Sequence, residues 1–420
     1  MARHFRNWLD GYLDYTQYSE APDQFHLWTG IATIAGALRR RTYLDMGYFK
    51  WHSNFFICFV APPGVVSKST TADIGIRLLK ELEEVRIGPS SATWQSLIRD
   101  LGNASQDFAI TPGPITPNTE FMTMSALTVA ASELGTFLDP EDRKSIDTLV
   151  NLWDCPDGAW EKSTKGEGLE VVVNPWFQLI GCTTPSWIAE NMGNYFIGGG
   201  FASRTLFVFA DTKRKLVAYP INHIPAGHME LAEHLVSDLK HIAQLVGKYT
   251  LTPAALKWGE NWYEEHYTQD NILRSDERFG GYFARKQIHI HKTAMIRAAS
   301  IRDQLVVTEE DLQWAHKQVT ALEPSMLRVF GEMNKEEIVR VQASLLRSLQ
   351  NAPDSRMRKD ELFRSFINQF GYITFEEALN ALYGAGLIQL ETHGSTTFLT
   401  LTEQYRQAQR AAHPPEQGAD

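Results

Sequence analysis

Residues 54–71 read NFFICFVAPPGVVSKSTT, and this stretch decides the fold that we expect for the rest of the chain. Its first half, from Phe55 to Val60, is a short continuous run of apolar residues, rich in aromatic and β-branched side chains. Such a run is typical of a strand buried on both faces of a parallel sheet. A turn containing Gly64, the pair Lys68-Ser69 and an amphipathic segment follow. Strand, glycine turn, lysine, hydroxyl residue and helix, in this order, are the layout of a phosphate-binding loop.

The chemistry of such a loop gives each part of the turn a role. Backbone N–H groups bind phosphate oxygens, the ammonium group of Lys68 reaches the β- and γ-phosphates of ATP, and the hydroxyl group of Ser69 holds Mg²⁺. The residues predicted to contact the nucleotide are Pro63, Gly64, Val65, Val66, Ser67, Lys68, Ser69 and Thr70. Pro62 and Ser67 stand where the motif usually has its two glycines. The alternative is an ordinary strand–turn–helix that carries Lys68 and Ser69 on its surface.

An acidic residue follows the next expected strand, residues 121–131. Glu133 stands at the carboxyl end of this strand, where a P-loop ATPase needs an acid that polarises the attacking water. Ser132 replaces the aspartate that usually precedes that acid. Ser132 is therefore a predicted Mg²⁺ ligand, with weaker or water-mediated coordination. The alternative for Glu133 is a strand-end acid without a catalytic role.

Two further residues are predicted to act on the γ-phosphate. Thr183 ends a third expected strand, within residues 174–185, where a hydroxyl group can sense that phosphate. Arg204 follows a run of three glycines and precedes the apolar strand 205–210, so it can reach the nucleotide of a neighbouring subunit as an arginine finger. The alternative for Arg204 is a structural arginine paired with a local carboxylate.

Residues 159–162 and 169–173 are expected to form a hairpin around the turn 165–168. Lys162 and Lys165 lie near its tip and are the predicted nucleic-acid contacts, in a loop that projects into a central pore. The alternative is a solvated hairpin tip. A second basic run, Arg39 to Arg41, is interpreted as a solvated helix end, with a subunit or nucleic-acid contact as the alternative.

Composition limits the possible functions. The chain has 420 residues, enough for two or three domains, and a net charge of -10, so nucleic-acid binding requires a local basic patch or a pore built by several subunits. Its three cysteines, Cys58, Cys155 and Cys182, have no metal-ligand spacing, and we expect them to be reduced in a cytoplasmic protein. The sequence shows no signal peptide and no apolar run of about 18 residues, so no membrane span is expected.

The expected domains are a helical N-terminal segment (1–52), a P-loop core (53–220), a helical lid (221–333), a winged helix (334–406) and a disordered tail (407–420). The basic cluster in residues 282–302 is interpreted either as a lid over the nucleotide or as a solvated face. The third helix of the winged helix, residues 374–383, carries Glu376 and Glu377 and no Arg or Lys. Because acids repel phosphate, this helix does not favour sequence reading in the major groove of DNA. A contact with another protein or a weak role in guiding a DNA strand is as consistent with its sequence.

The serial order of motifs resembles a known family. The order is APPGVVSKSTT, SSATWQSLI, ALTVAASELGTFL, LVNLWDCPDGAW, NPWFQLIGCTTPSWI and GGGFASRTLFVF, and the resemblance covers roughly residues 10–330. It is similar to the P-loop ATPases of phages, plasmids and integrated elements that often occur beside a primase domain. The resemblance implies an α/β, RecA- or AAA-like P-loop NTPase core. It also implies that Lys68 and Ser69 bind ATP and Mg²⁺, that Glu133 is the catalytic acid, that Thr183 is the sensor and that Arg204 is the finger.

By this resemblance the protein is expected to be an ATP-hydrolysing hexameric ring that moves along single-stranded DNA, like a replicative helicase. Its expected partners are further copies of the chain and a primase or another replication protein. One alternative is a nucleotide-switched scaffold or loader with slow hydrolysis in a replication or defence complex. Another is a DNA-binding regulator in which the winged helix acts and the P-loop is a relic.

Overall fold

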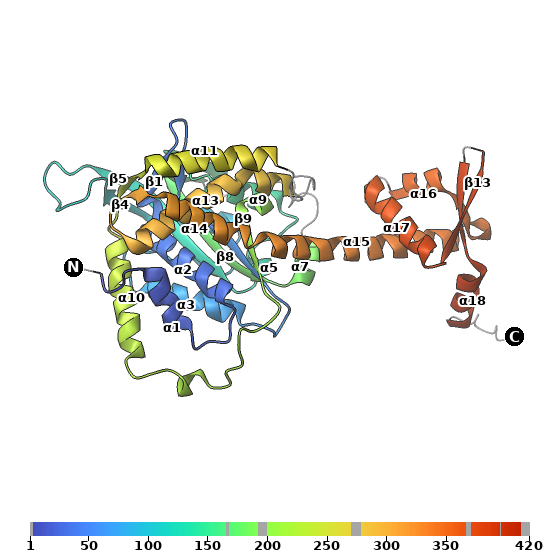
Figure 1. Cartoon of the computed structure of the whole chain (residues 1–420). Helices are drawn as coiled ribbons and strands as arrows, with labels where there is room; N and C mark the ends of the chain where they lie inside the picture. The colour runs from blue at the N-terminus through green and yellow to red at the C-terminus, as the bar shows by residue number, and fades with distance from the viewer. Residues whose placement is uncertain are drawn as a thin grey trace. The chain divides into compact units, whose positions relative to one another are not determined.

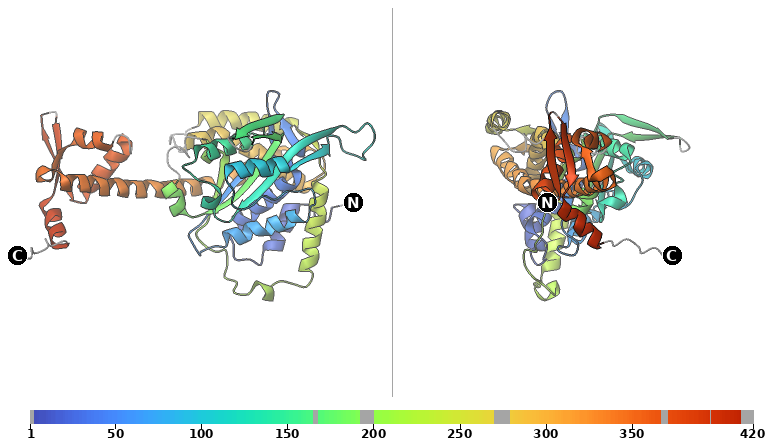
Figure 2. Two further views of the ribbon diagram at one scale, coloured as in Figure 1. Left: turned by 180° about the vertical axis from the view of Figure 1, so that it is seen from behind. Right: turned by 90° about the vertical axis from the view of Figure 1, so that its right-hand side faces the viewer.

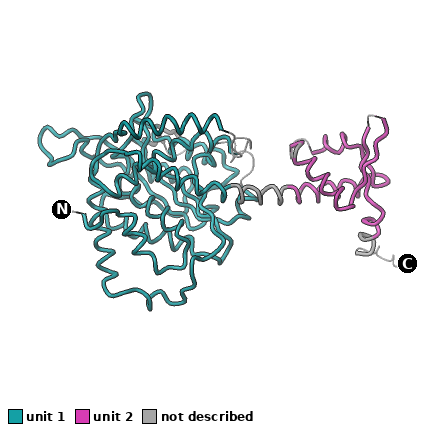
Figure 3. Tube along the Cα trace, in the orientation of Figure 1, with its two compact units in different colours: residues 1–329 teal, residues 330–420 magenta. Residues whose placement is uncertain are grey.

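The computed structural model describes residues 3–164, 168–191, 200–269, 279–366, 371–394 and 396–412. The chain divides into two compact units, residues 1–329 and residues 330–420 (Figure 3). The regions expected as N-terminal segment and P-loop core, and nearly all of the expected lid, belong to the first unit. No helix in the described part of the chain has the length and apolarity that crossing a membrane requires.

The first unit is built around a five-stranded sheet with the order β4-β5-β8-β3-β9 (Figure 1). Four strands are parallel, and β4 (Ser105–Ala109) pairs with β5 in the antiparallel direction at one edge. The parallel strands are β3 (Phe56–Val60), β5 (Phe121–Ala131), β8 (Pro175–Thr183) and β9 (Thr205–Phe209). Every residue of β3, β8 and β9 is buried, as the unbroken apolar runs predict. The fold is therefore mixed α/β with a largely parallel sheet.

Helices cover both faces of this sheet. On one face, Gln178 of β8 donates to the carbonyl oxygen of Ala32 at 2.8 Å. Ala32 belongs to α2 (Asp23–Leu38), which packs against α3 (Lys68–Lys80) and α1 (Trp8–Thr16). On the other face, Phe177 stacks on Phe137 of α5 (Leu134–Phe137), and Phe56 contacts Phe201 of α9 (Phe201–Arg204). The helices α4 (Trp94–Asn103), α6 (Arg143–Trp153) and α7 (Pro185–Asn191) follow β3, β5 and β8 in the chain.

A second sheet of four strands, ordered β11-β10-β1-β2, was not expected. Its strands are β1 (Thr42–Asp45), β2 (Lys50–His52), β10 (Gly247–Leu251) and β11 (Val306–Val307). The prediction of a helical segment up to residue 52 is therefore wrong for residues 42–52. The turn between β1 and β2 is closed by Gly47, whose φ is 86° and whose N–H donates to Asp45 Oδ1 at 2.9 Å. Only glycine adopts this φ without strain, which stabilises a hairpin here.

The remaining helices of the first unit are α10 (His228–Ile242), α11 (Pro253–Thr268), α13 (Gly280–Ile301) and α14 (Glu309–Thr320). The short 3₁₀ helices are η1 (Arg39–Arg41) and η2 (Pro220–Asn222). The basic cluster of α13 is largely internal, because Lys286, His289, His291 and Lys292 are all buried. Lys286 pairs with Glu323 at 2.6 Å. The interpretation of this cluster as a solvated face is therefore wrong for these four residues, while a lid whose Arg285 or Arg297 contacts phosphate stays a prediction.

The second unit has a small core of its own. Helix α15 (Glu323–Asn351) begins in the first unit and ends in the second. It is followed by η4 (Pro353–Ser355), β12 (Arg356–Arg358), α16 (Lys359–Phe366), α17 (Tyr372–Gly384), β13 (Ile388–His393), β14 (Thr396–Leu401) and α18 (Glu403–Ala412). The strands form an antiparallel sheet in the order β12-β14-β13, and Leu345, Leu362, Phe375 and Leu399 lie in the core.

Two expectations for the second unit are wrong in detail. The apolar spacing of residues 356–370 predicts the second helix of this domain, but residues 356–358 form β12, because they pair with β14. The expected disordered tail begins at residue 407, but α18 continues to Ala412. Residues 413–420 of that tail lie outside the described residues.

Candidate nucleotide-binding site

The predicted phosphate loop connects β3 to α3 at the carboxyl edge of the central sheet. Gly64 has a φ of 70°, and a Cβ atom built there would meet nothing within 4 Å, so backbone conformation alone favours glycine at this position. The turn is closed where the N–H of Lys68 donates to the carbonyl oxygen of Val66 at 3.0 Å. The hydroxyl group of Thr71 donates to the carbonyl oxygen of Ser67 at 2.7 Å. The N-terminus of α3, with its unsatisfied first-turn amides and its positive dipole end, therefore opens onto this loop.

Lys68 folds back over the loop that precedes it. Its ammonium group donates to the carbonyl oxygen of Ala61 at 3.0 Å, and the side chain is half-buried. No carboxylate among the described residues forms an ion pair with Lys68. A phosphate oxygen would replace a neutral carbonyl acceptor by a charged one, and such charge-assisted hydrogen bonds are the stronger kind. The loop thus holds a cation beside a helix N-terminus, which is a suitable arrangement for an anion.

The strand order brings the other predicted residues to the same edge. Strand β8 lies between β3 and β5, and its last residue, Thr183, is paired with Val60 at the end of β3. Thr183 is buried, and its carbonyl oxygen accepts from the N–H of Ala61 at 3.3 Å. Ser132 and Glu133 follow β5 directly and are exposed. Because carboxyl ends of parallel strands meet at one edge, the structure brings Lys68, Ser69, Ser132, Glu133 and Thr183 to one region.

The electrostatics of Cys182 support this arrangement. Burial raises the pKa of the Cys182 thiol to about 12, with the ammonium group of Lys68 lowering it and the carboxylates of Glu133 and Asp73 raising it. All three charges therefore act on one buried atom near the end of β8. The thiol stays protonated near neutral pH, so Cys182 is a packing residue here.

Asp73 was not predicted from the sequence. It lies on α3 four residues after Ser69, so the two side chains share one face of the helix, and Asp73 is exposed. The signal that could have found it is this i,i+4 spacing within the first two turns after Lys68.

The donor atoms at this edge fit Mg²⁺. The candidates are the hydroxyl groups of Ser69 and Ser132 and the carboxylates of Glu133 and Asp73, and Mg²⁺ prefers oxygen ligands. No group of three or more His, Cys, Asp or Glu residues in the described part of the chain is arranged to hold a metal ion without other ligands.

Arg204 lies at the opposite edge of the same sheet. It immediately precedes β9, whose carboxyl end is the one beside the phosphate loop. The side chain is buried: Nη2 pairs with Asp154 Oδ2 at 2.8 Å, and Nη1 donates to the carbonyl oxygen of Gly200 at 3.2 Å. Within one chain, Arg204 is thus a structural arginine paired with a local carboxylate, and it does not approach Lys68. A contact with nucleotide could only involve another copy and would require the pair with Asp154 to open.

The predicted hairpin is present, with longer strands than expected. Strand β6 (Ala159–Thr164) pairs antiparallel with β7 (Gly168–Val173), and the hairpin extends from the body of the first unit (Figure 2). Asn174, with a φ of 46°, holds its root: Oδ1 accepts from the N–H of Gly158 at 2.7 Å, and Nδ2 donates to the carbonyl oxygen of Thr123 at 2.7 Å. Lys162 lies in β6 opposite Glu170, whereas Lys165 lies outside the described residues. Because β8 starts directly after Asn174, the hairpin leaves the amino edge of the sheet.

The run Arg39 to Arg41 has a structural role that the sequence analysis missed. Arg39 and Arg40 are buried, and Arg40 donates to the carbonyl oxygens of Cys155 at 2.9 Å and Pro175 at 2.8 Å and pairs with Asp157. The interpretation as a solvated helix end is wrong for these two residues.

No family model matches the chain, and the comparison with curated proteins found no match.

Proposed function

We propose that the first unit binds and hydrolyses ATP as a RecA- or AAA-like P-loop domain. The observation that carries this proposal is the position of β8 between β3 and β5, because this strand order gathers Lys68, Thr183 and Glu133 at one edge. An isolated Lys-Ser pair at a helix start is a weak motif. The same pair, joined by a buried strand-end hydroxyl group and a strand-end acid, provides the groups that phosphoryl transfer to water requires.

Each residue has a distinct role in this proposal. The backbone N–H groups of residues 64–70 and the ammonium group of Lys68 bind the phosphates, and Ser69 and Ser132 face the metal. Bound Mg²⁺ supplies charge neutralisation for the phosphate oxygens. Glu133 orients the attacking water, and the hydroxyl group of Thr183 contacts the γ-phosphate.

We further propose that the protein is a ring-forming motor on single-stranded DNA, with the hairpin as its DNA contact and the second unit as a winged helix. Strand β8 connects the two activities: it begins at the hairpin root beside Asn174 and ends at Thr183. Its nine buried residues span about 30 Å at 3.3 Å per residue. A fully buried strand is a stiff element, so a shift at the phosphate edge can be transmitted to the hairpin.

The test separates binding, chemistry and DNA contact. Lys68→Ala is expected to abolish ATP binding and turnover. Glu133→Gln is expected to keep ATP binding and lose turnover by roughly 100-fold or more. The matched control is Lys80→Ala, an exposed lysine at the other end of α3, which should leave both unchanged. Calorimetry and phosphate release measure the two properties, and wild-type protein that shows no affinity for Mg·ATP would refute the proposal.

Alanine at Lys162 and Lys165 tests the DNA contact. The double variant is expected to keep basal ATP turnover and to lose stimulation by single-stranded DNA. The outcome that contradicts the pore assignment is unchanged binding of a fluorescent oligonucleotide by the double variant.

A nucleotide-switched scaffold or loader is the second candidate. Two observations favour it: Ser132 offers no carboxylate to the metal, and Arg204 is already paired with Asp154. This function predicts partner capture that requires ATP but proceeds equally well with Glu133→Gln. A motor instead needs turnover for every productive cycle, so the same variant would be inactive.

A further inference from the structure

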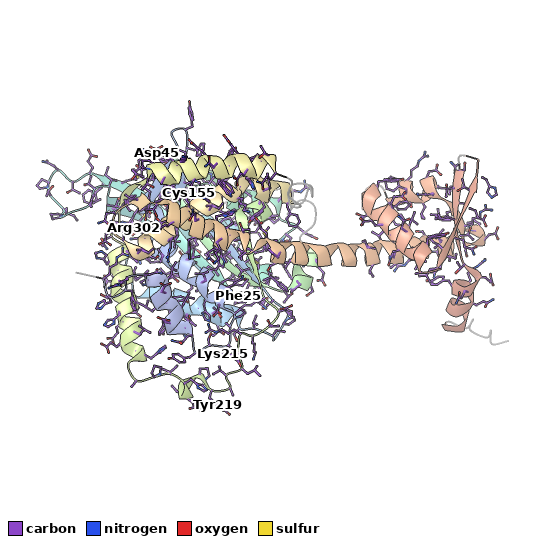
Figure 4. The ribbon with its side chains drawn as sticks, viewed as in Figure 1. Phe25, Asp45, Cys155, Lys215, Tyr219 and Arg302 are labelled. Atoms are coloured by element: carbon purple, nitrogen blue, oxygen red, sulfur yellow. The ribbon has the colours of Figure 1, made fainter. Side chains whose placement is uncertain are left out.

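Residues 211–227, which we call the strap, connect the end of β9 to the start of α10. The 3₁₀ helix η2, of three residues, is the only helix or strand within the strap. Connections of this length without regular structure are uncommon in compact domains, and those that persist usually have a binding role. In Figure 4 the strap carries the labelled residues Lys215 and Tyr219 at the lower edge of the first unit.

The root of the strap is firmly attached. The guanidinium group of Arg214 donates to the carbonyl oxygens of Ser19 at 3.0 Å and Thr16 at 2.6 Å, and it pairs with Asp23. Glu20 accepts from Lys213 Nζ at 2.5 Å and from the N–H of Val217 at 2.7 Å. These contacts fix residues 213–217 against the segment between α1 and α2.

Between and beyond these anchoring contacts the strap exposes large apolar side chains. Leu216 is 86% exposed, Tyr219 is 68% exposed and Ile221 is 75% exposed. Three such side chains present on the order of 300 Å² of apolar surface. An anchored segment whose outer side chains are apolar and face solvent is typical of an interaction surface.

The position of the strap limits what can cover it. The residue before the strap, Ala210, donates its N–H to the carbonyl oxygen of Val60 at 3.0 Å, so the strap starts beside the phosphate loop. Arg204 lies at the opposite edge of the sheet and cannot reach the loop of its own chain. A second copy that places its Arg204 near Lys68 must therefore approach the edge from which the strap emerges.

We infer that the strap docks on a second copy of this chain in a head-to-tail interface, with Leu216, Tyr219 and Ile221 buried against the neighbour. This inference rests on the proposed function, which needs a neighbour to complete the nucleotide site. The apolar area of the strap is less than half of the roughly 800 Å² per partner that a stable interface buries. The interface therefore needs further contacts beside the strap, and a head-to-tail contact gives a ring when its rotation closes.

The first experiment measures assembly of the full-length protein by sedimentation velocity, with and without Mg²⁺ and a non-hydrolysable ATP analogue. The variant Leu216→Ser/Tyr219→Ser/Ile221→Ser is expected to raise the concentration of half-assembly by roughly tenfold or more. The matched control is Leu256→Ser/Tyr263→Ser on α11, whose side chains are also exposed, at 50% and 43%. The control should assemble like the wild type. The inference would be overturned if the strap variant assembled as well as the wild type, or if the control variant lost assembly to the same extent as the strap variant. A wild-type protein that stays monomeric under all conditions would overturn it as well.

A second experiment does not depend on how well the triple variant folds. Ile221→Cys is labelled with a benzophenone maleimide, which is selective because Cys58, Cys155 and Cys182 are buried. In a mixture of isotopically light and heavy protein, we expect light–heavy cross-links from the strap. Cross-links confined to one chain would contradict the interface.

The two proposals fail in different ways. Binding of a fluorescent ATP analogue is measured at concentrations where the protein is monomeric, and the strap variant should bind it like the wild type. Wild-type protein that binds no analogue but associates through the strap would refute the nucleotide site and support the interface. Wild-type protein that binds the analogue but never associates would support the nucleotide site and refute the strap interface.

Discussion

Lys292 provides the most quantitative test of the interior of the first unit. It lies on α13, and its ammonium group donates to Asn54 Oδ1 at 2.8 Å and to the carbonyl oxygen of Asn54 at 3.2 Å. It also lies 3.6 Å from the centre of the Trp153 ring. These contacts join α13 to Asn54, two residues before β3, and to the end of α6. Burial lowers the pKa of Lys292 from 10.5 to about 7.

This shift determines how stability depends on pH. Below pH 7 the lysine is charged in both states, and the folded state carries the full cost of the buried charge. Between pH 7 and 10.5 the unfolded chain keeps a proton that the folded chain has lost, so the free energy of unfolding rises with pH. The slope approaches about 1.4 kcal/mol per pH unit above pH 7, which gives about 2 kcal/mol between pH 7 and pH 9 because the folded lysine is still half protonated at pH 7.

The variant Lys292→Met removes this titration. It leaves Asn54 Oδ1 without its partner, which costs about 1–3 kcal/mol at every pH. The change with pH therefore provides the test: the stability of the variant relative to wild type should fall by about 2 kcal/mol between pH 7 and pH 9. The exposed lysine Lys257 on α11 supplies the control, since Lys257→Met should keep the wild-type slope.

Tryptophan fluorescence during urea unfolding is a suitable assay. All 11 tryptophans of the chain lie in residues 1–329, so the signal reports the first unit even though the two units need not unfold together. A stability difference between Lys292→Met and wild type that changes by less than about 0.5 kcal/mol over this pH range would refute the assignment of the titration to Lys292.

Two further predictions concern the hairpin root and the cysteines. Asn174→Ala removes both hydrogen bonds of the side chain and places alanine at a φ of 46°, so it is expected to destabilise the hairpin root by about 1–3 kcal/mol. The measurement is amide hydrogen exchange, which should become faster in β6 and β7. Unchanged exchange would contradict this role of Asn174. Cys58, Cys155 and Cys182 are all buried, and burial raises the pKa of each thiol, so a thiol reagent at pH 7 should modify none of them until the protein unfolds; rapid native-state labelling would show that at least one of them is accessible.

The elements that could be predicted from sequence are those whose signal is local. The run from Phe55 to Val60 is fully buried, and its short length, its aromatic and β-branched residues and the Pro62-Pro63-Gly64 turn after it favour a strand over a buried helix. The hairpin of β6 and β7 was predicted from two short runs around a glycine-containing turn. Both segments fold as neighbours in the chain, so their pattern contains most of the information that places them.

The elements that were missed depend on distant partners. Strand β1 pairs with β10, which is about 200 residues away, and β10 itself has only five residues. Arg40 donates to carbonyl groups 115 and 135 residues away. A run of three arginines looks like a solvated helix end until these distant carbonyl groups are known. The same holds for Lys292, whose partner Asn54 is 238 residues away.

The candidate site divides along the same line. Lys68 and Ser69 could be predicted because their motif is local, and Glu133 and Thr183 because strand ends are recognisable. For Arg204 the alternative of a structural arginine paired with a carboxylate describes the arrangement within one chain, but the partner could not be named, because Asp154 is 50 residues upstream, in the segment between α6 and the hairpin.

The segment between α6 and the hairpin connects the partner of Arg204 to the start of β6. Asp154 holds Arg204, and Asp157, three residues later, binds both Arg40 and Lys50 just before β6 begins. In the proposed ring, a neighbour's triphosphate competes with Asp154 for the guanidinium group of Arg204. If the triphosphate wins, the segment that leads into the hairpin loses one of its ion pairs, while Asp157 still attaches its other end. We therefore expect nucleotide bound by one copy to change the position of the hairpin in the next copy, which is how a ring can pass a strand from subunit to subunit.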